Sequence, residues 1–117
     1  MDKLFDILFL EEAFEYLKSL DKRHYEKILY NIRKAQFGQE PELLKKFTEE
    51  IWEFRTLFEG IQHRLLAFWD KSDKSNTLVV STHGFNKKRS KVPVAEINKA
   101  KQIRNKYFED QQNTKKV

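Results

Sequence analysis

The spacing of apolar residues divides the first part of the chain into one strand and two helices. Residues 4–9 are rich in Leu, Ile and Phe and partly alternate, which predicts a strand. Apolar residues then recur at helical spacing over 10–20 and over 25–35, with Asp21 suited to cap the second helix and Gly38 suited to end it. The short join between the helices predicts an antiparallel hairpin.

After a polar connection over 39–50, the spacing changes to the alternation that is typical of strands. Residues 51–58, 61–69 and 77–83 are three such stretches, separated by turn-forming residues. Because the joins are short, we expect these three strands to form an antiparallel meander. Pro93 suits the first turn of a final helix, which has a broad apolar arc.

These elements predict an α+β fold in the order β-α-α-β-β-β-α, with the helices packed on one face of an antiparallel sheet. The other face is then partly open, and Glu53 and Arg55 should project onto it. Residues 1–110 are expected to form a single domain, and 111–117 a polar C-terminal tail.

Composition limits the environment of the protein. A chain of 117 residues with 39% hydrophobic residues is large enough for one folded core. It has no cysteine, which excludes disulfides and thiolate metal sites and fits the reducing cytoplasm. The acidic N-terminus lacks the basic start of a signal peptide, and no apolar run reaches the length of a membrane span. We therefore expect a cytoplasmic protein with no membrane partner.

Charge is distributed unevenly along the chain. Residues 1–85 contain 13 Lys and Arg against 15 Asp and Glu, whereas residues 86–117 contain 10 against 3. Such asymmetry suggests a polyanionic partner for the C-terminal third, although a solvated basic helix would have the same composition.

Isolated arginines within strands are the first candidates for chemistry. Arg55 and Arg64 each lie among apolar residues, where desolvating a charge costs free energy unless an anion pairs with it. The third strand is followed by a run of cations, namely Lys87, Lys88, Arg89 and Lys91. Cations that converge from neighbouring strand ends would suit a phosphate, whereas ordinary cross-strand ion pairs are the alternative interpretation of Glu53 and Arg55.

The pattern of elements and motifs resembles RelE/HigB-type toxins, above all their phage-derived, HigB-like branch. The segments that carry the resemblance are Lys46–Phe47, Trp52–Arg55 (WEFR), Arg64–Phe68 (RLLAF), Gly84–Lys88 (GFNKK) and the helix opening with Pro93, Glu96 and Ala100. The resemblance implies a RelE-like fold and the toxin of a type II toxin–antitoxin system. Such toxins are endoribonucleases that cleave mRNA, usually in the ribosomal A site, without a metal or other cofactor. The implied partners are mRNA, the ribosome and a cognate antitoxin, commonly a HigA-like helix-turn-helix protein.

The resemblance also suggests roles for individual residues. Arg64 is expected to clamp the scissile phosphate, because its planar fork can bind two oxygens. Arg55 would make a second phosphate contact or orient Glu53. Lys87 and Lys88 would add positive charge, and one of them would donate a proton to the leaving oxygen.

The general base is left open between Glu53 and His83, since both lie at strand positions that could face the site. His24 and His63 show no metal-ligand spacing and are expected at the surface or partly buried. Contacts to the flanking RNA are expected from Lys45, Lys46, Phe85, Arg89 and Lys91.

Two other functions share this architecture. A ParE-like toxin would bind and inhibit DNA gyrase without cleaving RNA, since a fold does not fix a function. A non-catalytic nucleic-acid-binding module would use the basic C-terminal third alone.

Overall fold

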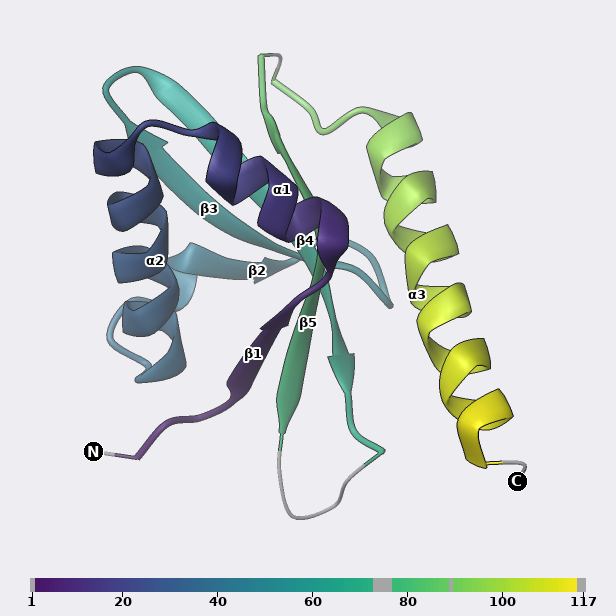
Figure 1. The fold of residues 1–117 in the computed structure, drawn as a ribbon. Coiled ribbons are helices and arrows are strands. Elements are labelled where there is room, and N and C mark those ends of the chain that lie inside the picture. The colour runs from purple at the N-terminus through teal and green to yellow at the C-terminus, as the bar shows by residue number, and fades with distance from the viewer. Residues whose placement is uncertain (1, 73–76, 89, 116–117) are drawn as a thin grey trace.

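A single mixed sheet lies at the centre of the structure, a computed structural model that describes residues 2–72, 77–88 and 90–115 (Figure 1). The strands found in these residues are β1 (Asp6–Phe9), β2 (Leu44–Lys46), β3 (Trp52–Phe58), β4 (Ile61–Asp70) and β5 (Leu78–Asn86). Their order across the sheet is β1-β5-β4-β3-β2. Strand β1 runs parallel to β5, and the other neighbouring pairs are antiparallel.

The helices begin and end where local sequence favours it. They are α1 (Glu11–Ser19), α2 (Lys22–Gln36) and α3 (Val94–Lys115), with a short 3-10 helix, η1, over Pro41–Leu43. The side chain of Asp21 caps α2 by accepting a hydrogen bond from the backbone N–H of His24 at 3.1 Å. Gly38, with φ of +69°, follows the end of α2 in the left-handed conformation that glycine tolerates best. No helix in the described part of the chain is both long and apolar enough to cross a membrane.

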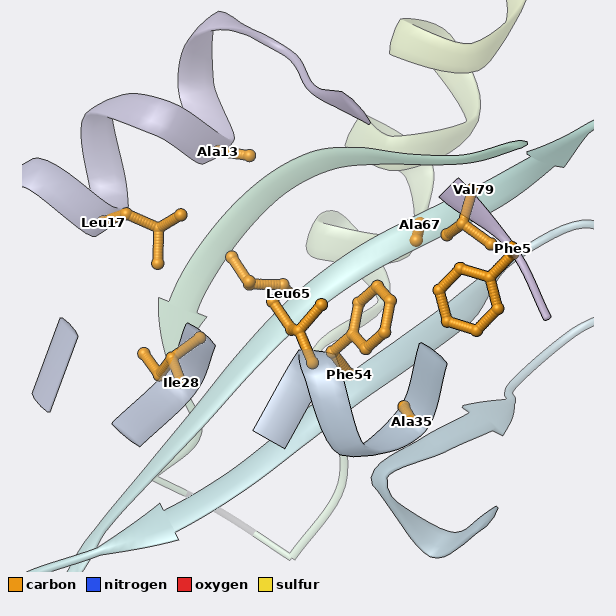
Figure 2. Close-up of a cluster of buried hydrophobic side chains, with 10 residues drawn as sticks. Phe5, Ala13, Leu17, Ile28, Ala35, Phe54, Leu65, Ala67 and Val79 are labelled. Atoms are coloured by element: carbon orange, nitrogen blue, oxygen red, sulfur yellow. The ribbon is translucent and has the colours of Figure 1, made fainter. Parts of the chain in front are cut away.

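Helices α1 and α2 cover one face of the sheet (Figures 1 and 2). Side chains from both helices and from four strands or strand flanks meet in one buried cluster. Its members are Phe5, Ala13, Leu17, Ile28, Ile32, Ala35, Phe54, Leu65, Ala67 and Val79. Because Leu65 and Ala67 alternate with their neighbours along β4, the intervening side chains point to the opposite face.

Helix α3 covers part of that opposite face. Phe68 of β4 is fully buried and packs its ring against Tyr107 and Phe108, with ring centroids 5.2 and 5.5 Å away. A second small cluster joins Leu66 of β4 to Ala100 of α3. Strand β4 is therefore buried on both faces.

The α+β class is confirmed, but three details of the predicted architecture are wrong. The sheet is mixed, because β1 pairs in parallel with β5. The helices do not share one face, because the apolar arc of α3 packs on the far side from α1 and α2. The connection over 39–50 contains the extra strand β2, in which Leu44 and Lys46 lie opposite residues of β3. Helix α3 also continues through Gln111, whose side chain donates to Asp70 Oδ2 at 3.2 Å.

Removing the ring of the buried Phe68 should destabilise the protein far more than removing the ring of a surface phenylalanine. Phe68→Ala leaves a cavity between β4 and α3 and is expected to lower the free energy of unfolding by about 3–5 kcal/mol. The control is Phe14→Ala, since Phe14 is 48% exposed and should cost far less. Urea unfolding measures both. Equal losses in the two variants would contradict the packing of α3 on this face.

Candidate functional site

Three neighbouring strands bring five of the predicted residues onto the face that α3 partly covers. Arg55 of β3 lies opposite Arg64 of β4, and Arg64 lies opposite Phe85 of β5. Glu53 and His83 occupy the next row, on either side of a leucine of β4. Directly paired residues point to the same side of a sheet, so these five side chains form one surface, called here the arginine face.

A β-bulge decides which residues of β5 belong to the arginine face. Leu66 pairs with His83 whereas Ala67 pairs with Ser81, so Thr82 has no partner of its own on β4. The extra residue reverses the alternation beyond it, which turns His83 toward α3 and Gly84 toward the other face. Without the bulge, the strand would present the opposite set of side chains to Arg64.

The two arginines share one carboxylate. Glu53 Oε1 lies 3.5 Å from Arg55 Nε, and Glu53 Oε2 lies 3.8 Å from Arg64 Nε. Arg64 is only 3% exposed, and its Nη1 and Nη2 donate to His63 O and Gln62 Oε1 at 3.0 and 3.2 Å. Like charges directly opposite one another in a sheet are destabilising. The two arginine charges therefore share the carboxylate of Glu53. The pKa of Glu42 is lowered by its hydrogen bond with Lys45 and also by the charge of Arg55.

Unsatisfied polar atoms gather at the same place. In the described part of the chain, five buried side-chain nitrogen or oxygen atoms lack a hydrogen-bond partner, and four of them belong to the arginine face. These four are Glu53 Oε2, Arg55 Nε, Arg64 Nε and His83 Nε2, and the fifth is Trp69 Nε1. Native proteins leave few buried polar groups unsatisfied, so this concentration distinguishes the arginine face from the rest of the described residues.

Burial sets the charge states of two groups on this face. Desolvation lowers the pKa of the Arg64 guanidinium, and the charge of Glu53 opposes that change, but an arginine remains charged near neutral pH. Burial likewise lowers the pKa of His83 below its ordinary value of 6.5, against the attraction of Glu96. Glu96 Oε1 lies 3.4 Å from His83 Nε2, and Thr82 Oγ1 lies 3.0 Å from His83 Nδ1. His83 is therefore neutral at pH 7.

The lysines after β5 differ in how the structure places them relative to the arginine face. The backbone N–H of Lys87 donates to Gln62 O at 2.7 Å, which continues the pairing of β5 with β4 by one residue. Lys87 is half-buried there, whereas Lys88 and Lys91 are exposed further along the chain. Arg89 lies outside the described residues. Among the described lysines of this run, the strand pairing therefore holds Lys87 next to the paired residues Arg55 and Arg64.

The two lysines of β2 point to different faces. Lys45 lies opposite Glu53 and so shares the side of the arginine face, where it also pairs with Glu42 at 2.8 Å. Lys46 lies opposite Trp52, which points to the face covered by α1 and α2. The two predicted RNA contacts therefore start from opposite faces of the sheet, at its β2 edge.

Phe85 has packing partners of its own. It stacks on the ring of His83 with centroids 5.9 Å apart, and it packs against the small cluster of Ile51, Leu66 and Ala100. The half-buried ring supports α3 as well as bordering the arginines.

A comparison with protein families gives a match to the family described as Phage derived protein Gp49-like (DUF891), over residues 15–105. The chain belongs to the Gp49-like family. The matched span contains β2, β3, β4, β5 and the first part of α3, so it covers every residue of the arginine face. Gp49-like proteins are phage-derived and are often associated with toxin–antitoxin modules. A search of curated proteins finds no significant match.

Sequence reasoning missed several residues of the Gp49-like chain. The expectation that His24 and His63 lie at the surface or partly buried is wrong, because both are buried and they are hydrogen bonded to each other at 2.9 Å. They are separated by 39 residues, so no local spacing could have linked them. Gln62, which contacts Arg64 from two residues away on β4, was not singled out. Glu96 was named only as part of the motif at the start of the last helix, because its contact with His83 depends on how α3 packs.

Neutralising Glu53 should expose the repulsion between the two arginines. Glu53→Gln leaves Arg55 and Arg64 opposed with no anion, and it is expected to lower the free energy of unfolding by about 3 kcal/mol. The double variant with Arg55→Gln removes one of the repelling charges and should recover part of that loss. Glu15→Gln is the control, because it breaks an exposed pair with Lys18 that is worth about 1 kcal/mol or less. Equal effects of the two glutamine substitutions would argue against the electrostatic account.

Proposed function

We propose that this Gp49-like protein is the toxin of a toxin–antitoxin pair and that its arginine face cleaves mRNA without a metal. The observation that carries the proposal is the opposed pair Arg55 and Arg64, with one shared acid and unsatisfied nitrogens on both guanidiniums. Like charges directly opposite one another destabilise a sheet, whereas a bound phosphate could pair with both guanidiniums. The family's association with toxin–antitoxin modules supports the same conclusion.

In the proposed reaction, the 2′-oxygen of RNA attacks the adjacent phosphorus and the 5′-oxygen leaves. Negative charge then builds up on the phosphoryl oxygens, which preorganised cations stabilise more strongly than they stabilise the ground state. Arg55, with a side chain 37% exposed, would meet the phosphate from solvent, and Arg64 would approach it from the interior. Glu53 would hold both guanidiniums in place.

We assign the two proton transfers to different groups. His83 would accept the proton of the 2′-hydroxyl, because it is neutral at pH 7 and Glu53 is already engaged with the arginines. Since His83 is only 2% exposed, the first turn of α3, which carries Glu96, would have to move aside for RNA. Lys87, beside the arginine row, would donate the proton to the leaving oxygen.

The finer assignments follow from the resemblance to RelE/HigB-type toxins and belong to the same proposal. They include a RelE-like fold, action on the ribosome in the cytoplasm and a HigA-like helix-turn-helix antitoxin. Two strongly exposed apolar side chains, Leu57 and Val94, are suited to contact such an antitoxin.

Loss of Arg64 should abolish toxicity together with cleavage. Arg64→Ala removes a cation aimed at the transition state, so we expect the cleavage rate to fall by about 100- to 1,000-fold. The measurement is controlled expression in bacteria, with growth followed and transcript 5′ ends mapped. Arg33→Ala, an exposed arginine on α2, is the matched control and should retain both effects. Arrest by the wild type with intact transcripts and damaged DNA would instead favour inhibition of gyrase.

The pH dependence of cleavage should identify the base. His83 accepts a proton only when neutral, and its pKa lies below 6.5, so cleavage should stay constant on acidification to about pH 6.5 and decline below it. His83→Gln should lower the rate by about 100-fold and remove that decline. The rate is measured with a short RNA over a pH series. An acid decline that survives unchanged in His83→Gln would exclude His83 as the base.

A further inference from the structure

A continuous line of hydrogen-bonded polar side chains lies on the opposite face of the sheet from the arginines, beneath α1 and α2. In order, its members are Glu59, His24, His63, Tyr16 and Asn86, and together they are called the relay. His24 Nε2 lies 3.1 Å from Glu59 Oε1, and its Nδ1 lies 2.9 Å from His63 Nε2. His63 Nδ1 lies 2.6 Å from the Tyr16 hydroxyl, which donates to Asn86 Oδ1. Both histidines are buried, whereas Glu59 and Asn86 reach the surface.

Two features of the backbone are suited to this arrangement. Glu59 has φ of +49°, a conformation that costs a residue with a side chain about 1–2 kcal/mol and that glycine, asparagine or aspartate usually occupies. Its carboxylate is nevertheless held where it meets His24. At Gly84, an added Cβ would overlap the ring of Tyr16, so a glycine is required for the hydroxyl to reach between β4 and β5.

The relay is joined to the arginine face through the strands themselves. The carbonyl oxygen of His63 accepts a hydrogen bond from Arg64 Nη1 at 3.0 Å. At the other end, Asn86 directly precedes Lys87, whose N–H donates to Gln62 O at 2.7 Å. Gln62 in turn accepts from Arg64 Nη2 at 3.2 Å. Side chains on one face thus fix the two strand positions that present Arg64 and Lys87 on the other.

Counting protons gives the charge of the relay. Tyr16 uses its one proton toward Asn86 Oδ1, so it must accept from His63 Nδ1–H. Neutral His63 then has a bare Nε2, which accepts from His24 Nδ1–H. His24 Nε2 faces a carboxylate, which can only accept, so this nitrogen also carries a proton. In this arrangement His24 is an imidazolium and His63 is neutral.

When the histidine pair loses one proton to solvent, the hydrogen bonds from His24 Nδ1 through His63 and Tyr16 to Asn86 must all change direction. His24 keeps the proton that it donates to Glu59, and its bare Nδ1 accepts from His63 Nε2–H. His63 Nδ1 then accepts from the Tyr16 hydroxyl. That hydroxyl no longer has a proton for Asn86, so the amide must turn and donate its N–H to the Tyr16 oxygen. The proton is lost at the histidines, but the last group to move stands beside Lys87.

We propose that the relay positions Arg64 and Lys87 and that loss of one proton reverses its hydrogen bonds. The importance of these two residues rests on the proposed function. The charged and titratable groups that face the histidine pair are Tyr16 from α1, Asp21 and Arg23 from α2, and Glu59 from the β3–β4 turn, with Arg64 across the sheet. Burial and the charge of His24 both lower the pKa of His63, which agrees with one proton shared by the pair.

NMR of the intact protein tests the coupling directly. The ring nitrogens of both histidines, the side-chain amide of Asn86 and the Arg64 Nε–H signal are followed between about pH 5 and about pH 8, where histidines titrate. We expect one shared titration of the histidine pair, with the signals of Asn86 and Arg64 changing at the same midpoint. Signals of Asn86 and Arg64 that stay fixed while the histidines titrate would overturn the proposal.

Two variants with matched controls locate the effect in the relay. Glu59→Gln removes the anion that stabilises the imidazolium and should lower the midpoint by about one pH unit, whereas Glu26→Gln, on the exposed side of α2, should leave it unchanged. Tyr16→Phe should uncouple Asn86 and Arg64 from the histidine titration, and the exposed Tyr30→Phe should not. An unmoved midpoint in the first variant, or retained coupling in the second, would refute the relay.

Cleavage of RNA by the same samples separates this proposal from the proposed function. Coupled signals in a protein that cleaves no RNA would support the relay and refute the proposed ribonuclease. If the protein cleaves RNA but its Asn86 and Arg64 signals do not change when the histidines titrate, the ribonuclease is supported and the relay is refuted.

Discussion

Strand β4 is buried on both faces, and this constraint determines how every polar side chain on it must behave. Helices α1 and α2 remove water from one side, and α3 removes it from the other. Apolar residues such as Leu65 and Phe68 gain stability from this double burial. His63 and Arg64 are buried in the same strand but must find hydrogen bonds or opposite charges within the protein. The consequences are the relay, which satisfies His63 on one face, and the arginine face, where Glu53 pairs with Arg64 on the other.

Much of the fold could be predicted because it depends on local patterns. The helices follow from 3.6-residue spacing with Asp21 and Gly38 at their ends, and the β3–β4 hairpin follows from alternation across a short turn. Three features could not, because they depend on distant contacts. The parallel pairing of β1 with β5 joins segments about 70 residues apart, the face chosen by α3 is a matter of packing, and β2 is too short and polar to give a periodic signal.

The candidate site divides in the same way. Arg55 and Arg64 could be placed on one face from the sequence, since a tight hairpin fixes their register. His83 and Phe85 lie on the same face as the two arginines because of the bulge at Thr82, and no residue type in this stretch predicts a bulge. The histidine pair was hidden for another reason. His24 lies in α2 and His63 in β4, and no local motif around either residue predicts that the two will meet.

The bulge at Thr82 also determines how the chemistry of β5 depends on chain length. On its far side, odd-numbered residues point to the arginines and even-numbered residues point to the relay. Deleting Thr82 would place Ser81 next to His83, and because their partners Ala67 and Leu66 are already consecutive on β4, every later pair would keep its face. Deleting a residue beyond the bulge would instead exchange the faces of all the strand residues that follow it. For the evolution of such a surface, a three-nucleotide deletion is therefore a small step at the bulge and a large one just beyond it.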